Sequence, residues 1–86
     1  MNVTVEISMY PLRSDYEEQV LKFIDLLKEN PNLRISVNAM STQITGQYDE
    51  VLNHIQDCIK AVYQKDVKAS FALKILPGAL DLDFSL

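Results

Sequence analysis

The 86-residue chain has one cysteine, one histidine and no long apolar run, and each scarcity excludes a class of protein. Cys58 alone cannot form an internal disulfide, and one cysteine with one histidine is too few for a typical zinc site. No apolar run approaches the roughly 20 residues of a membrane-spanning helix. Residues 1–4 show neither the basic nor the apolar region of a secretory signal. We therefore expect a cytoplasmic protein without membrane insertion.

Basic residues are also scarce, since eight Lys and Arg stand against twelve Asp and Glu, for a net charge of −4. Nucleic-acid-binding proteins usually present a basic patch, so nucleic acid is not an expected partner. A mildly acidic chain is compatible with a cationic ligand, although net charge mainly governs solubility. The apolar fraction of 48% is that of a globular protein. The length predicts one domain, residues 1–86, with residues 77–86 as a C-terminal tail.

Four segments alternate between apolar and polar residues, as is typical of half-buried strands. They are residues 3–10, 33–39, 41–46 and 69–76. In the first segment, Val3, Val5, Ile7 and Met9 are expected to face one side, and Thr4, Glu6, Ser8 and Tyr10 the other. In the last segment, the apolar side is formed by Phe71, Leu73 and Ile75.

Two segments show helical spacing instead. Ser14 and Glu17 fit a capping box at the start of the first helix, which is expected to end near Pro31. The second helix follows Gly46 and is expected to end near Asp66. The apolar faces are Tyr16, Val20, Phe23, Ile24 and Leu27 in the first helix, and Val51, Leu52, Ile55, Ile59 and Val62 in the second.

The order strand, helix, strand, strand, helix, strand predicts the α+β class. With right-handed crossovers it gives a ferredoxin-like βαββαβ sandwich, in which two helices cover one face of a four-stranded antiparallel sheet. The first and third strands are central in that fold. The opposite face is solvated, binds a ligand or forms a subunit interface. Its expected side chains are Glu6, Ser8, Tyr10, Ser36, Asn38, Ser41, Gln43 and Thr45.

Residues 6–12, residues 38–46 and the run Tyr48-Asp49-Glu50-Val51 resemble the YkoF-like family of thiamine- and hydroxymethylpyrimidine-binding proteins. The resemblance covers roughly residues 3–76 in the same order of elements. It implies a ferredoxin-like fold and the binding of thiamine, or of its aminopyrimidine precursor, without chemistry. The member that gives the family its name carries two copies of the domain, whereas this chain has one. Related one-copy proteins form dimers or tetramers, so the resemblance implies a homo-oligomer here.

Seven polar or aromatic residues are candidate ligand contacts. A carboxylate at Glu6 accepts from an exocyclic amine or neutralises a cationic ring, and a tyrosine stacks on a pyrimidine. Amide side chains mix donors and acceptors, as an aminopyrimidine edge does. The alternatives are an inter-subunit ion pair of Glu6 with Arg34 or Lys74, a tyrosine packed in an interface, and a core-facing Thr42. The candidates are Glu6, Ser8, Tyr10, Asn38, Ser41, Thr42 and Gln43.

The sequence gives no reason to expect catalytic residues, metal ligands or a cofactor. Cys58 is expected to be a small buried side chain, and His54 to lie at the surface. Arg13 is similar in position to the anion-binding arginine of acylphosphatases, but residues 10–13 contain no glycine to cradle a phosphate. A structural module whose polar face is a subunit interface is the second hypothesis, and an acylphosphatase-like hydrolase is the third.

Overall fold

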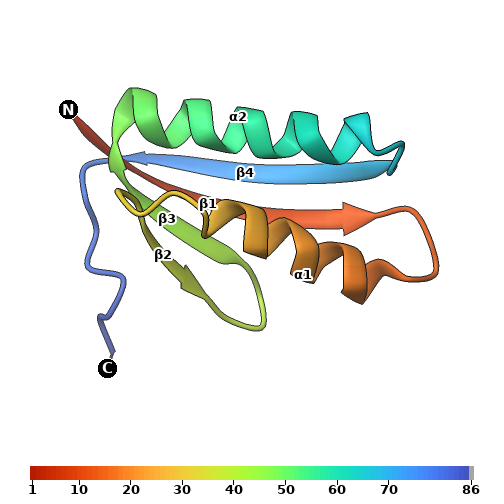
Figure 1. Ribbon diagram of the computed structural model, residues 1–86. Coiled ribbons are helices and arrows are strands. Elements are labelled where there is room, and N and C mark those ends of the chain that lie inside the picture. Colours follow the sequence, from red (N-terminus) through yellow and green to blue (C-terminus); the bar gives the residue numbers. More distant parts are fainter. Residues whose placement is uncertain (86) are drawn as a thin grey trace.

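The structure is a computed structural model that describes residues 1–85. Its elements follow the predicted βαββαβ order (Figure 1). The strands pair antiparallel in the order β2-β3-β1-β4, which confirms the ferredoxin-like sandwich with β1 and β3 at its centre. The elements are β1 (Asn2–Pro11), α1 (Tyr16–Leu27), β2 (Arg34–Val37), β3 (Thr42–Gln47), α2 (Tyr48–Gln64) and β4 (Ala69–Pro77).

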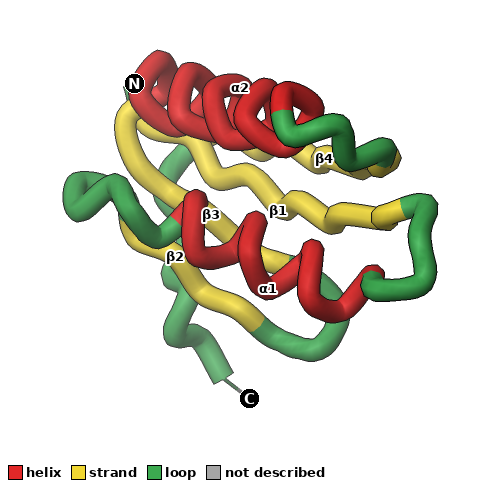
Figure 2. The backbone as a smooth tube through the Cα atoms, turned by 45° about the vertical axis from the view of Figure 1, so that its right-hand side comes forward, coloured by secondary structure: helices red, strands yellow, loops and turns green. Residues whose placement is uncertain are grey.

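Both helices cover the same face of the sheet (Figure 2). The apolar side chains of β1 point into the layer between sheet and helices, where the backbone period of two places them on one face. Ile44 joins them from β3, Phe23 and Leu27 from α1, and Val51 and Ile55 from α2. The predicted inward faces of β1 and α2 are thus confirmed. No helix described within residues 1–85 is long and apolar enough to cross a membrane.

The predicted capping box at Ser14 is wrong. Helix α1 begins at Tyr16 with Asp15 as its N-cap residue, and Ser14 lies outside the helix. The Asp15 carboxylate does not cap a backbone N–H, because Arg13 and Gln19 occupy it. The Gln19 amide donates to Asp15 Oδ2 at 2.9 Å and, with Arg13, lowers the pKa of that carboxyl. The buried amide of Gln19 is satisfied in this way.

Strand β3 runs directly into helix α2 without a connecting loop. Gln47 caps the helix, since its side-chain oxygen accepts from the Glu50 N–H at 2.9 Å. Gly46 faces the helices, and a Cβ there would lie 2.8 Å from Leu33 Cδ2 and 3.2 Å from Val51 Cγ2. The glycine therefore permits the close approach of the start of α2 to the sheet.

The segment after β4 crosses the polar face at the N-terminal end of β1, a contact that the alternation pattern gave no means to predict. The Thr4 hydroxyl donates to the Gly78 carbonyl at 2.8 Å and accepts from the Leu80 N–H at 3.0 Å. Arg34 forms an ion pair with Asp83 further along. Thr45 does lie on the polar face, opposite Thr4, but both are buried under this segment. The open part of the face is therefore confined to Glu6 and beyond.

We expect Thr4→Val to release residues 78–85 from the sheet and to lower the free energy of unfolding by about 1–3 kcal/mol, because buried hydrogen-bonding groups lose their partner. Hydrogen exchange at the Leu80 amide and urea unfolding measure the two effects. Ser36→Ala is the matched control, since Ser36 pairs with Gln43 on the polar face and the hydrogen bonds that hold residues 78–85 to the sheet involve Thr4 and Arg34 instead. Unchanged exchange at Leu80 would show that other contacts hold the segment.

Candidate functional site

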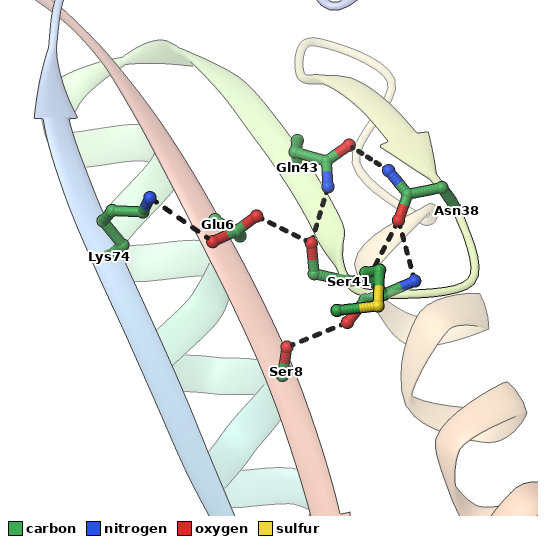
Figure 3. Close-up of polar contacts among 7 residues, drawn as sticks. Glu6, Ser8, Asn38, Ser41, Gln43 and Lys74 are labelled. Atoms are coloured by element: carbon green, nitrogen blue, oxygen red, sulfur yellow. Dashed lines mark hydrogen bonds and ion pairs between the residues drawn. The ribbon is translucent and has the colours of Figure 1, made fainter.

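Six polar residues on the open sheet face form one connected group, which we call the polar cluster (Figure 3). The Ser41 hydroxyl donates to Glu6 Oε2 at 2.9 Å, and Gln43 Nε2 donates to Ser41 Oγ at 2.7 Å. Lys74 Nζ lies 3.8 Å from Glu6 Oε1. The members are Glu6, Ser8, Asn38, Ser41, Gln43 and Lys74.

Strand register brings these side chains together. Glu6 of β1 lies opposite Gln43 of β3 on one side and Lys74 of β4 on the other. Cross-strand partners point to the same face of a sheet, and Cβ atoms of such pairs are about 5 Å apart. The carboxylate is therefore held between an amide and an ammonium group by the backbone alone.

Asn38 belongs to the turn between β2 and β3, not to a strand as predicted. Its side-chain Oδ1 accepts from the N–H groups of Met40 at 2.9 Å and Ser41 at 3.1 Å, which is an Asx-type turn. The Ser8 hydroxyl donates to the Met40 carbonyl at 3.4 Å, so β1 also contacts this turn. Strand β2 is shorter than the predicted residues 33–39 because Asn38 diverts the chain after Val37.

The turn also fixes the direction of the hydrogen bonds that link Asn38, Gln43 and Ser41. Because Asn38 Oδ1 accepts from two backbone N–H groups, its Nδ2 is left to donate to Gln43 Oε1, at 3.5 Å. Gln43 must then donate through Nε2 to Ser41, and Ser41 must donate to Glu6. The chain of donors ends on the carboxylate. An incoming group at Glu6 therefore meets acceptor oxygens.

Two hollows adjoin the cluster. The open-face hollow, of about 300 Å³, is bordered by Glu6, Ser8, Tyr10 and Lys74. The end hollow, of about 420 Å³, lies between β1, α1 and the turn at residues 38–41. Both volumes are of the size that small-molecule sites have. The two hollows share Ser8, Tyr10, Met40 and Ser41 as lining residues.

Five candidates on the open face or its rim line these hollows, namely Glu6, Ser8, Tyr10, Asn38 and Ser41, and Gln43 joins them through its hydrogen bond to Ser41. Thr42 is different, because it is paired with Ile7 on the helix-facing side and is buried. It borders the end hollow but does not join the polar cluster. Tyr10 is 57% exposed at the end of β1.

Several residues near the site were not among the candidates. Lys74 pairs with Glu6 within the chain, and Arg34 pairs with Asp83, so the inter-subunit partners proposed for Glu6 are engaged within this chain. Met40 lines both hollows, and Tyr16 and Glu17 reach the end hollow from α1. The alternation of apolar and polar residues along β4 was enough to place Lys74 on the polar face. No sequence signal places α1 beside the turn at residues 38–41, since that contact is tertiary.

The prediction of a surface position for His54 is wrong. The ring is half-buried between the helices, with Nε2 2.9 Å from the Leu27 carbonyl at the end of α1. Cys58, one helical turn later, is buried as predicted, and its Sγ lies 3.7 Å from the same Nε2. Burial, together with Glu29 and Asp57, raises the pKa of the Cys58 thiol to about 11. The thiol therefore stays protonated at neutral pH and is a poor nucleophile.

The described residues offer little support for a metal site or for an anion-binding site at Arg13. Within residues 1–85, no group of three or more His, Cys, Asp or Glu side chains is placed to hold a metal ion. Arg13, the anion-binding candidate, is paired with the Asp15 carboxylate. A carboxylate at that distance opposes the binding of a phosphate.

Solved structures with the same fold come from several microorganisms. A domain of unknown function, DUF77, from Bacillus cereus is 22% identical, with a TM-score of 0.78 over 96% of this chain and 85% of that chain. A hypothetical protein from Methanocaldococcus jannaschii is 26% identical, with a TM-score of 0.76 over 96% and 87%. A Thermotoga maritima protein described in terms of thiamine biosynthesis or salvage is 19% identical, with a TM-score of 0.71 over 96% and 92%.

No curated protein matches the chain in sequence. The family described as thiamine-binding protein does match, over residues 5–76, which include all four strands but the first residues of β1 and the last of β4. The matched range also contains both hollows. This match confirms the resemblance carried by residues 6–12 and 38–46, and the chain belongs to the thiamine-binding protein family.

Proposed function

We propose that the protein is a cytoplasmic, non-enzymatic binding protein for thiamine or its hydroxymethylpyrimidine moiety, with the aminopyrimidine seated on the polar cluster. The observation that carries this proposal is the chain of donors that ends on the half-exposed Glu6 carboxylate beside a hollow of about 300 Å³. Family membership supports the same ligand class.

The chemistry of an aminopyrimidine complements the cluster. Its exocyclic amine is a donor, and Glu6 presents acceptor oxygens. Its ring nitrogens are acceptors, and the second hydrogen of Gln43 Nε2, beyond the one donated to Ser41, is a donor on the same face. The exposed ring of Tyr10 offers a stacking surface at the end of β1. Three kinds of contact thus converge on one planar heterocycle.

The side chains of the cluster are also held in place before any ligand arrives. Ser41, Gln43 and Asn38 are fixed by one another and by the backbone of the turn. Binding to such a site loses little side-chain freedom, which increases affinity for a given number of contacts.

We expect titration calorimetry to detect binding of hydroxymethylpyrimidine and thiamine, and Glu6→Gln to weaken both about 10- to 100-fold, because a hydrogen bond to a charged group is lost. Glu18→Gln is the control, since Glu18 pairs with Lys22 on the exposed side of α1. No heat and no thermal shift with either ligand at millimolar concentration would refute the function. Unchanged affinity of Glu6→Gln would remove Glu6 from the site.

Self-association is a second role, and strand β4 favours it. Within residues 1–85, β4 pairs with β1 on one side and with no strand on the other. It exposes Leu73 by 42%, Ile75 by 52% and Leu76 by 37%. A free strand edge with exposed apolar side chains is a template for pairing with another chain. We therefore propose that a homodimer contact, within a dimer or tetramer, lies at β4 rather than at the polar cluster.

Sedimentation velocity tests this assembly. We expect the ligand-free protein to sediment as a dimer or tetramer, and Ile75→Lys to shift it to the monomer, because a buried charge at the contact is costly. Asn53→Lys, on the exposed side of α2, adds the same charge elsewhere and should leave the assembly unchanged. A wild-type protein that stays monomeric at high concentration would refute self-association.

A further inference from the structure

The open-face hollow lies beside β1 because the side chains that β4 places there are short. Ser8 of β1 is paired with Ala72, and Tyr10 is paired with Ser70. Cross-strand partners share one face of a sheet, so these two short side chains leave space above the sheet next to Ser8 and Tyr10. Lys74, which is paired with Glu6, is the longest side chain that β4 contributes to the lining of this space.

The lining of the open-face hollow contains two charged side chains of opposite sign, Glu6 and Lys74. Lys74 Nζ lies 3.8 Å from Glu6 Oε1, and the strand register keeps the two residues opposite each other (Figure 3). The other lining residues are Ser, Tyr, Met, Ala and Leu. A ligand in the hollow therefore meets an ion pair without net charge, in place of an isolated carboxylate.

This ion pair leaves the hydrogen-bonding capacity of Glu6 available to a ligand. A distance of 3.8 Å is longer than a hydrogen bond, so Lys74 acts on Glu6 through its charge. The Ser41 hydroxyl donates to the other carboxylate oxygen, Oε2. Because an ionised carboxylate has about four acceptor sites, Oε1 can still accept from an incoming donor.

Charge and hydrogen-bond acceptance are thus separated at Glu6. A carboxylate alone would attract every cation as well as accept from every donor. Beside Lys74, a ring with a fixed positive charge is repelled by the ammonium group while it is attracted by the carboxylate, whereas a neutral amine still donates to Oε1. Of the two roles expected for Glu6, acceptance from an amine remains, and the carboxylate charge is neutralised by Lys74 rather than by the ligand.

We infer that Lys74 is a specificity-determining residue, which restricts the ring bound at Glu6 to neutral heterocycles that carry an amine and opposes rings with a fixed positive charge. The inference rests on the proposed function and deepens it by naming the charge state of the bound ring. Both side chains are partly exposed, Glu6 by 42% and Lys74 by 66%, so solvent screens the effect and salt weakens it further.

Titration calorimetry with hydroxymethylpyrimidine and with its ring-N-methylated cation tests this role, because the two probes share a ring and differ in charge. We expect Lys74→Met to tighten the cation roughly 3- to 10-fold, an effect that decreases at high salt, and to change the neutral probe less than about twofold. Lys74→Arg keeps the charge and should keep the wild-type ratio of affinities. Lys22→Met is the control, since Lys22 pairs with Glu18 on the exposed side of α1.

The inference and the proposed function fail in different ways. If hydroxymethylpyrimidine binds and Lys74→Met leaves the ratio of the two affinities unchanged, or weakens both probes equally, Lys74 does not select by charge and the pyrimidine site stands without it. If Lys74→Arg changes the ratio as much as Lys74→Met does, the shape of the side chain is responsible and the inference is again overturned. If neither hydroxymethylpyrimidine nor thiamine binds the wild type, the proposed function itself is wrong.

Discussion

The alternation of side chains along β1 is the constraint on which both the core and the candidate site depend. The strand is central, so its backbone pairs on both sides, and its side chains leave in two directions. Val5 and Ile7 are fully buried under the helices, while Glu6 and Ser8 emerge between them on the other face. A shift of register by one residue would bury the carboxylate and expose the core. Core packing therefore fixes the position of Glu6.

Unequal coverage of the polar face then determines where a ligand has access. At one end, residues 78–85 cross the sheet and bury Thr4 and Thr45. At the other end, the pairing of β1 with β3 ends at Ile7 and Thr42, and β1 continues without a neighbouring strand on that side. Strand β1 is thus covered by the C-terminal segment at its start and accessible at its end. The polar cluster lies between these two regions, next to the hollows.

The sequence predicted what depends on periodicity and missed what depends on tertiary contacts. Alternation was sufficient to place Glu6, Ser8 and Gln43 on one face, and the order of elements was sufficient for the topology. His54 was misplaced because its partner, the Leu27 carbonyl, belongs to the other helix. The Ser14 cap failed for a local reason, because the first backbone bond of α1 runs from the Gln19 N–H to the Asp15 carbonyl and Asp15 is the N-cap residue. Propensity rules describe neighbours in sequence, whereas the contact of His54 is set by packing.

The polarity of the hydrogen-bond chain connects the fold to ligand choice. Two backbone N–H groups of the turn orient the Asn38 amide, and that orientation passes through Gln43 and Ser41 to Glu6. Reversing any member would oppose two donors or two acceptors, so the cluster has one low-energy arrangement. A ligand at Glu6 must donate, because an ionised carboxylate only accepts. An exocyclic amine meets this demand and a phosphate does not, and the turn contributes by holding Ser41 and Gln43 in the orientation that supports the carboxylate.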